Sequence, residues 1–317
     1  MSPLLASIPR GARVTVIRLR SLGDCVLTTP ALALLKAERP DLTIQIIVDP
    51  RFAAVFEGSS DVDEIWVNAG LIRKSRPELL LNLHGGTRSM TMTFTSGAKY
   101  RAGFGHHRYS FIYSHKIPRA QEILDQERPV HTAEHLASAM FWMGVPQQEI
   151  PRAKLVASAA PNDFGNYMVF HPYASLPEKT WPAERFVAVA RALRETLGYE
   201  PVFLAGPADD PAPFAEFRVW RNAPLADVKS LLAGASLFIG NDSGPAHVAA
   251  AFGVPVVVLF GPSNPVTWAP WKTEARVITS REDIARIETT EVLEAGQSLN
   301  AKQGLKATPI QRTKVKA

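Results

Sequence analysis

Residues 13–24 read RVTVIRLRSLGD, a short apolar run followed by a polar turn, and the residues after this turn have helical spacing. The run at 14–17 predicts a buried strand, and the apolar positions of residues 24–38 predict a helix. The second half repeats the pattern at residues 237–247, which read LFIGNDSGPAH. A strand that turns directly into a helix presents backbone N–H groups and an acidic side chain together, which suits an anionic ligand.

Short strands alternate with helical segments in both halves of the chain, which predicts two doubly wound parallel sheets and an α/β fold. Between the halves lies a segment rich in Pro, Ala and Ser that has no periodicity. We therefore expect two Rossmann-like domains, at residues 1–150 and 167–297, joined by a linker at 151–166. Ligands of such sheets bind at the carboxyl ends of the strands, so we expect a cleft between the domains.

Composition excludes several classes of protein. Of the 317 residues 46% are hydrophobic, yet no apolar run approaches the roughly 20 residues that a membrane span needs. The first ten residues lack a secretory signal, so we expect a cytoplasmic protein. Cys25 is the single cysteine, and the histidines follow no metal-binding spacing, so neither a metal nor another cofactor is expected.

The net charge of +5 resides in the last twenty residues. Residues 298–317 contain five Lys and Arg and no acid, so the rest of the chain is balanced. This polar, basic tail predicts disorder, with a weak contact to an anionic membrane face as the alternative. A nucleic-acid partner is not expected, and strongly salt-dependent binding to DNA would indicate one.

Two loops carry the candidate chemistry. Gly23 and Asp24 lie at the first strand-to-helix turn, where Gly23 allows a turn that a side chain would obstruct; Asp24 either caps the helix or acts on a ligand. Lys179 lies in a long polar loop after a strand, and Trp181-Pro182 closes this loop. Such a loop can place an ammonium group beside a diphosphate, whereas an isolated surface lysine would have no function.

The second strand-to-helix turn adds further candidates. Asp242 or Ser243 can cap the helix, Gly244 lets a ligand approach the backbone, and His247 points either into the cleft or into the core. The sequence has no GxGxxG, GxxxxGK[ST] or GxSxG motif, which argues against a dehydrogenase, a P-loop hydrolase and a serine hydrolase.

Together, the stretches at 17–30, 171–182 and 241–262 resemble glycosyltransferase family 9, the heptosyltransferases of bacterial lipopolysaccharide core assembly. The resemblance implies a GT-B architecture, two Rossmann-like domains that face a cleft. It also implies inverting transfer of a heptose from a nucleotide sugar such as ADP-heptose to a glycolipid acceptor, without an essential metal. An acceptor of this kind would bring the protein to the cytoplasmic face of the inner membrane as a peripheral protein.

The resemblance also implies roles for individual residues. Asp24 would be the general base, and Lys179 would stabilise the departing diphosphate. The remaining candidates would bind the donor: Asp242, Ser243, Gly244 and His247 its sugar and phosphates, Ser175 a phosphate and Asp209 the ribose, with Gly23 beside the base. Two alternatives remain open: a nucleotide-sugar epimerase of the same architecture and a non-catalytic glycan-binding protein.

Overall fold

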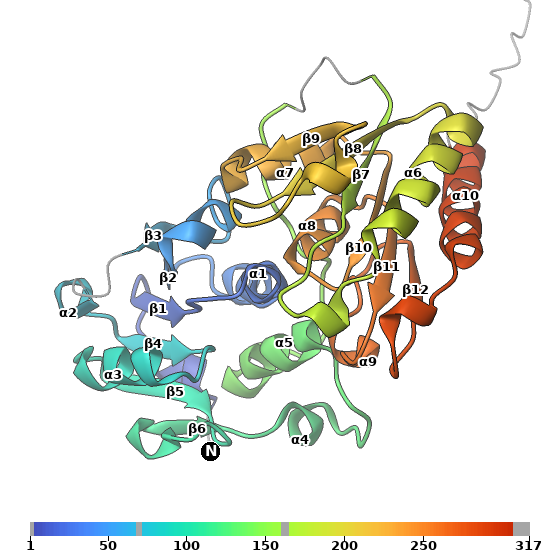
Figure 1. Cartoon of the computed structure of the whole chain (residues 1–317). Coiled ribbons are helices and arrows are strands. Elements are labelled where there is room, and N and C mark those ends of the chain that lie inside the picture. The colour runs from blue at the N-terminus through green and yellow to red at the C-terminus, as the bar shows by residue number, and fades with distance from the viewer. Residues whose placement is uncertain (1–2, 68–71, 160–164, 307–317) are drawn as a thin grey trace, which may run out of the picture.

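The computed structural model describes residues 3–67, 72–159 and 165–306, and it has two lobes, each built on a six-stranded sheet (Figure 1). All paired strands run parallel, in the orders β3-β2-β1-β4-β5-β6 and β12-β11-β10-β7-β8-β9. The predicted pair of doubly wound parallel sheets is therefore confirmed.

The N-terminal sheet consists of β1 (Arg13–Ile17), β2 (Thr43–Ile47), β3 (Glu64–Trp66), β4 (Leu79–Asn82), β5 (Tyr100–Phe104) and β6 (His115–Ile117). The C-terminal sheet consists of β7 (Tyr167–His171), β8 (Glu200–Ala205), β9 (Arg218–Arg221), β10 (Leu237–Asn241), β11 (Val256–Phe260) and β12 (Ala275–Thr279). In each sheet the strand order reverses between two central strands, β1 and β4 in the first and β7 and β10 in the second. Ligands of doubly wound sheets bind in the crevice at this point.

Helices cover both faces of each sheet. The N-terminal lobe has α1 (Leu22–Glu38), α2 (Ile72–Ser75), α3 (Thr87–Thr95), α4 (Ala120–Leu124) and α5 (Thr132–Met143). The C-terminal lobe has α6 (Ala183–Leu197), α7 (Leu225–Ala233), α8 (Gly244–Phe252), α9 (Pro265–Trp268) and α10 (Thr289–Lys306). Three short 3₁₀ helices matter below: η2 (Pro50–Val55), η4 (Ser110–Ile112) and η5 (Pro177–Lys179).

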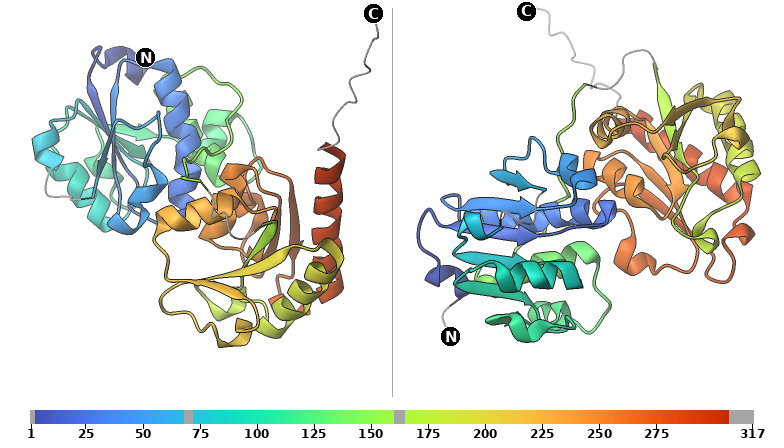
Figure 2. Two further views of the ribbon diagram at one scale, coloured as in Figure 1. Left: turned by 90° about the horizontal axis from the view of Figure 1, so that it is seen from above. Right: turned by 60° about the vertical axis from the view of Figure 1, so that its left-hand side comes forward.

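The two lobes share a hydrophobic core where their inner helices meet. Helix α1 packs against α5 of its own lobe and against α8 of the other, and Figure 2 shows it lying between the two sheets. One continuous cluster of buried side chains includes Leu27 of α1 and Ala249 of α8. On the outer faces, α2 and α3 cover the N-terminal sheet, and α6 and α10 cover the C-terminal sheet.

The prediction of a disordered tail from residue 298 is wrong for residues 298–306, which belong to α10. Leu299 is buried, and α10 packs against α6. Residues 307–317 lie outside the described residues, as does part of the predicted linker at 160–164. The predicted domain boundaries otherwise stay predictions. No helix within the described ranges combines the length and apolar character that crossing a membrane requires.

Candidate functional site

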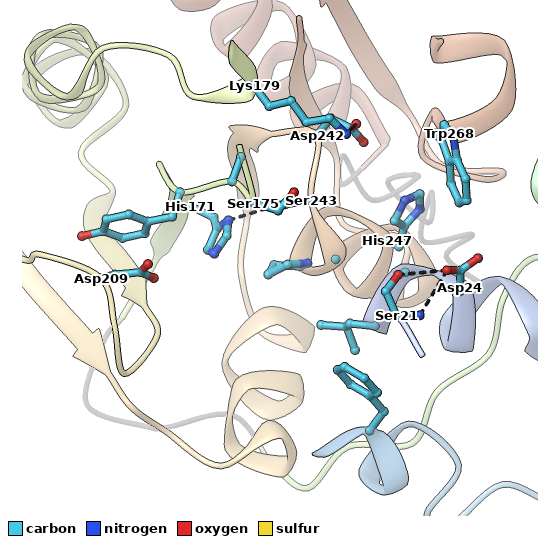
Figure 3. A pocket seen from close by; sticks show the side chains of 17 residues that line it. Ser21, Asp24, His171, Ser175, Lys179, Asp209, Asp242, Ser243, His247 and Trp268 are labelled. Carbon is cyan, nitrogen blue, oxygen red and sulfur yellow. Dashed lines mark hydrogen bonds and ion pairs between the residues drawn. The ribbon is translucent and has the colours of Figure 1, made fainter. Parts of the chain in front are cut away.

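A cavity of about 530 Å³ lies between the lobes, and all nine candidate residues line it. Gly23 and Asp24 come from the start of α1, after β1. The other seven come from the C-terminal lobe: Ser175, Lys179, Asp209, Asp242, Ser243, Gly244 and His247. Figure 3 shows Asp24 on the side opposite Lys179 and Asp242. The carboxyl ends of β1, β7, β8 and β10 therefore supply one shared site.

Asp24 is both a helix cap and a cavity residue. It is the third residue of α1, and its Oδ2 accepts hydrogen bonds from the backbone N–H of Ser21 at 3.1 Å and from its hydroxyl at 3.0 Å. The side chain is 19% exposed, which leaves it accessible from the cavity. The two interpretations of Asp24 are thus compatible, because capping fixes the carboxylate at the cavity wall.

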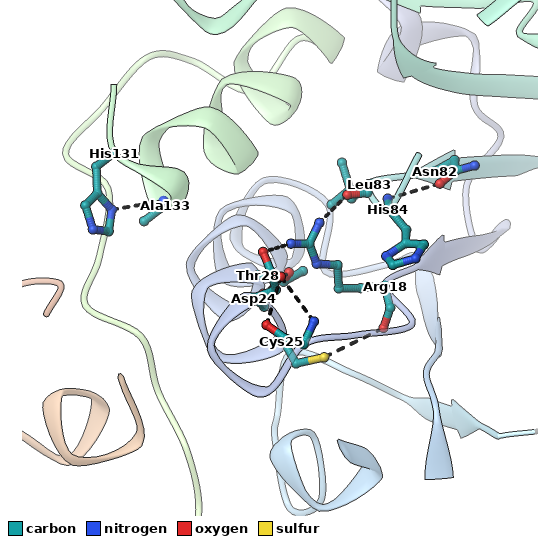
Figure 4. Close-up of polar contacts among 10 residues, drawn as sticks. Arg18, Asp24, Cys25, Thr28, Asn82, Leu83, His84, His131 and Ala133 are labelled. Carbon is teal, nitrogen blue, oxygen red and sulfur yellow. Dashed lines mark hydrogen bonds and ion pairs between the residues drawn. The ribbon is translucent and has the colours of Figure 1, made fainter. Parts of the chain in front are cut away.

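Arg18 holds the other oxygen of Asp24 (Figure 4). Its guanidinium donates to Asp24 Oδ1 and to the carbonyl of Leu83, which follows β4, so it ties the two central strands of the N-terminal sheet to the carboxylate. Arg18 is 8% exposed. Nearby Cys25 is fully buried, and burial raises the pKa of its thiol to about 12, which agrees with a packing role.

The loop that carries Lys179 is fixed from both ends by one buried amide. Asn241 donates from Nδ2 to the carbonyl of Pro172 at 2.8 Å, and its Oδ1 accepts the backbone N–H of Trp181 at 3.2 Å. The indole of Trp181 is buried and donates to the carbonyl of Ile287 at 3.0 Å. The loop is therefore held in place, as the Trp-Pro closure predicted, and Lys179 Nζ lies 3.5 Å from Asp242 Oδ2.

Two imidazoles of the site are neutral at neutral pH. The Oγ of Ser243 lies 3.0 Å from His171 Nδ1, and burial lowers the pKa of His171 to about 4. Burial also lowers the pKa of His247 to about 4. His247 Nδ1 has no hydrogen-bond partner among the described residues. Both side chains can therefore exchange hydrogen bonds with a ligand without contributing a positive charge.

Gly23 and Gly244 mark the point where α1 and α8 meet. A Cβ on Gly23 would lie 2.6 Å from His247 Cδ2, and a Cβ on Gly244 would lie 2.8 Å from the Cβ of Leu22. The prediction that Gly23 forms a turn is wrong, because it lies in the first turn of α1. Its small size instead admits a side chain of the opposite lobe.

The last two candidates line the cavity from loops of the C-terminal lobe. Ser175 is an exposed residue of the loop after β7. Asp209 follows β8, and its Oδ2 accepts the backbone N–H of Gly206 at 2.7 Å, which closes the turn on which it sits. Asp209 is partly buried, so part of its carboxylate still faces the cavity.

Sequence reasoning assigned no role to several residues of the site. Phe52, Tyr173 and Trp268 line the cavity, and Arg18 contacts Asp24. Two of them had a local signal, since Arg18 lies just after the first strand and six residues before Asp24, and Tyr173 lies in the loop that carries Lys179. The aromatic residues come from three separate segments that only the tertiary fold brings together.

Comparisons with known proteins address the family and the fold. The family model of "Glycosyltransferase family 9 (heptosyltransferase)" matches residues 71–295. Lipopolysaccharide heptosyltransferase 3 of Escherichia coli is 27% identical in an alignment 289 positions long that covers 80% of this chain and 84% of that protein. A family 9 glycosyl transferase structure from Veillonella parvula superposes with a TM-score of 0.82 at 24% identity, covering 92% of this chain and 97% of that one. The structure of E. coli ADP-heptose lipopolysaccharide heptosyltransferase II gives a TM-score of 0.77 at 22% identity, covering 92% and 99%.

Proposed function

The chain belongs to glycosyltransferase family 9, and from this premise we propose that it transfers a heptose with inversion from ADP-heptose to an acceptor of the lipopolysaccharide core. One observation carries the proposal. A carboxylate from one lobe and an ammonium group with a helix N-terminus from the other face the same cavity. This is the pairing that glycosyl transfer to a hydroxyl requires, since one side removes a proton and the other stabilises an anion.

The donor would occupy the C-terminal side of the cavity. Helix α8 begins at Gly244, so its positive end faces the cavity where the diphosphate would bind. When the donor binds, the ammonium group of Lys179 would exchange part of its interaction with Asp242 for a contact with the diphosphate. We assign Ser175, Ser243 and His247 to hydrogen bonds with phosphate or sugar oxygens and Asp209 to the ribose hydroxyls.

The acceptor hydroxyl would lie beside Asp24. The oxygen of this hydroxyl attacks the anomeric carbon of the heptose. The bond between that carbon and the diphosphate oxygen breaks on the opposite face. Asp24 accepts the hydroxyl proton, and the electron pair of the broken bond leaves on ADP. Lys179 and the N-terminus of α8 stabilise the negative charge on this leaving group. A lipopolysaccharide precursor as acceptor would place a cytoplasmic enzyme at a membrane face.

Incubating the purified protein with ADP-heptose and a heptose-deficient, deacylated core acceptor tests this function. We expect release of ADP, an acceptor heavier by one heptose by mass spectrometry, and an inverted anomeric configuration by NMR. Thermal-shift measurements should show stronger stabilisation by ADP than by UDP or GDP.

The same donor incubated alone separates the alternatives. A change in the configuration of ADP-heptose without acceptor would identify an epimerase. Binding of donor or glycan without any turnover would identify a glycan-binding protein. Either result would contradict the proposed transfer.

A further inference from the structure

The N-terminal lobe carries an exposed aromatic cluster on the outer side of its sheet. Phe94 of α3 is 70% exposed and Phe111 of η4 is 75% exposed, the highest values among the exposed large hydrophobic side chains of the described residues. With Tyr109 and Ile112 they surround a hollow of about 440 Å³. We call these four residues the aromatic patch. Figures 1 and 2 show α3 on the side of the N-terminal lobe that faces away from the C-terminal lobe.

The aromatic patch stands on a fixed base. Tyr113 is buried beneath it and donates from its hydroxyl to the Sδ of Met90, at 3.0 Å. Arg101 donates from Nε to the carbonyl of Ile112 at 3.1 Å, which anchors the end of η4. The two phenylalanine rings therefore project from anchored backbone. Exposed apolar clusters on such a surface mark sites of interaction with another apolar phase.

The sequence around the aromatic patch is strongly basic. Residues 79–121 contain six Lys and Arg and no Asp or Glu: Arg88, Lys99, Arg101, Arg108, Lys116 and Arg119. Arg108 stacks on Tyr109, with its guanidinium carbon 5.3 Å from the ring centroid. Glu78, which precedes the segment, is paired with Lys99. The balance of charge outside the tail thus conceals a basic stretch of sequence, of which Arg108 lies on the aromatic patch itself.

An anionic lipid surface matches this combination better than a protein does. Phenylalanine side chains enter the boundary between headgroups and acyl chains, while arginines contact the phosphates. Two phenylalanines at these exposures present roughly 300 Å² of surface. A stable protein interface needs about 800 Å² from each partner. The patch is therefore too small to hold a second chain but large enough to insert into a bilayer.

The aromatic patch is connected to the carboxyl end of the N-terminal sheet, where Asp24 lies at the start of α1. His107, two residues before Tyr109, packs so closely on Gly85 that a Cβ there would lie 2.5 Å from its Nε2. Gly85 is two residues from Leu83, whose carbonyl accepts the hydrogen bond from Arg18. Arg18 in turn holds Asp24. These contacts connect the aromatic patch to the Asp24 carboxylate along the carboxyl end of the N-terminal sheet.

We infer that the aromatic patch, with Arg108 stacked on Tyr109, forms the surface by which the N-terminal lobe docks on an anionic bilayer. The inference rests on the proposed function in one respect, because the acceptor would be a glycolipid of that bilayer. It moves the predicted membrane contact from the basic tail to the lobe that carries the proposed base. Phe94 and Phe111 would insert, and Arg108 would bind lipid phosphate.

Flotation of the full chain with vesicles tests the inference. The wild-type protein should float with vesicles of phosphatidylglycerol and phosphatidylethanolamine and much less with phosphatidylcholine alone. The double variant Phe94→Ser/Phe111→Ser should lose about tenfold or more in apparent partition coefficient. Arg108→Gln should lose about fivefold at low salt. Both sites are exposed, and circular dichroism should show both variants folded.

Two control variants separate the patch from other surfaces. Val277→Ser changes an exposed apolar side chain of the other lobe, 38% exposed, and should float like wild type. A chain ending at Lys306 lacks the last eleven residues but keeps α10, and it should lose less than the double variant. The inference is overturned if the double variant floats like wild type, if only the shortened chain loses binding, or if wild type ignores lipid charge. A dimer that the double variant dissociates, or single-stranded RNA binding that it abolishes, would also overturn it.

Kinetics distinguish this inference from the proposed function. With a deacylated, water-soluble acceptor the double variant should keep kcat and KM within about twofold of wild type. With the same acceptor anchored in vesicles its KM should rise roughly tenfold. Failure of wild type to transfer heptose to either acceptor would refute the proposed function and leave the flotation result to decide the docking surface.

Discussion

At the scale of single residues, the Asp24 carboxylate has one acceptor site left for chemistry. An ionised carboxylate offers about four lone-pair positions. Ser21 uses two through its backbone N–H and hydroxyl, and Arg18 uses a third. The remaining position can take a proton from a hydroxyl in the cavity, and the three bonds prevent the side chain from rotating away.

Replacing Asp24 by Asn removes the proton acceptor and keeps the side-chain volume. We expect Asp24→Asn to lower kcat by about 10²- to 10⁴-fold, since general base catalysis contributes this much, while the Kd for ADP changes only a few-fold. Initial rates at saturating substrates and calorimetric titration with ADP measure the two quantities. Asp63→Asn is the matched control, because Asp63 pairs with Lys36 and does not line the cavity. A kcat within tenfold of wild type would remove the base assignment.

Lys179 should act on both binding and rate. Its Nζ lies at the cavity 3.5 Å from Asp242, so Lys179→Ala removes the cation nearest the proposed diphosphate. We expect weaker ADP binding and a kcat reduced by about 100-fold, because charge on the leaving group grows in the transition state. Lys272→Ala is the control, since Lys272 pairs with Glu149 outside the cavity. Normal values of both parameters would show that Lys179 is a surface lysine without function.

The sequence located the site because parallel sheets bring the ends of their strands together. Each candidate residue followed a predicted strand, so one topological rule placed all nine around one cavity. Phe52 and Trp268 also follow strands, in η2 after β2 and in α9 after β11, but an aromatic residue in such a segment is as often part of the core, so nothing marked them as cavity residues. The sequence could not show why residue 23 is a glycine, because His247, the side chain that needs the space, is distant in sequence.

At the scale of elements, the site depends on two helix starts that meet across the lobes. Leu22 and Gly23 of α1 lie against Gly244 and His247 of α8 with no room for an added methyl group. Their contact fixes the separation between the carboxylate that follows β1 and the amide groups that follow β10. The distance between the proposed base and the donor site therefore depends on having glycine at positions 23 and 244.

Gly23→Ala tests this contact. Within a helix the change itself favours folding by about 0.5–1 kcal/mol, so the N-terminal lobe should stay folded. The new methyl group would displace His247 and push α8 from α1, which should lower kcat/KM by roughly 10- to 100-fold. Gly244→Ala should behave alike, since it opens the same contact from the other side. Full activity of the Gly23 variant would show that the lobes tolerate a wider spacing.

The strands were easiest to predict where they are fully buried and hardest at the sheet edges formed by β6 and β9. The central strands β1, β4, β10 and β11 are apolar runs, and the helices between them have clear spacing. By contrast, β6 and β9 are short, partly exposed edge strands, and the sequence shows no apolar run at either. Helix α3 is rich in threonine, a residue with weak helical preference. Its burial against β4 decides its conformation.

At the scale of the whole molecule, a buried lysine joins both lobes to the segment between them. Lys229 of α7 is 3% exposed, and its ammonium donates to the carbonyl of Ala54 in η2 and, at 2.7 Å, to that of Val156. Burial lowers the pKa of this lysine, because holding an ammonium group out of water is costly. The two carbonyls offset part of this cost because each accepts a hydrogen bond from the ammonium group in a part-buried contact.

Replacing Lys229 by Met keeps the aliphatic length and leaves both carbonyls without this donor. A part-buried acceptor left without its donor costs up to about 1–3 kcal/mol, and part of this is recovered because no ammonium group has to be buried. We expect a net loss of about 1–3 kcal/mol in the free energy of unfolding. For a chain of this length, that loss lowers Tm by roughly 2–5 °C. Calorimetry of Lys229→Met beside Lys116→Met, an exposed lysine in β6, measures the difference. Because the bond joins α7 to η2, the variant should also raise the KM for the acceptor more than it weakens ADP binding. An unchanged Tm would mean that the shared apolar core alone holds the lobes in register.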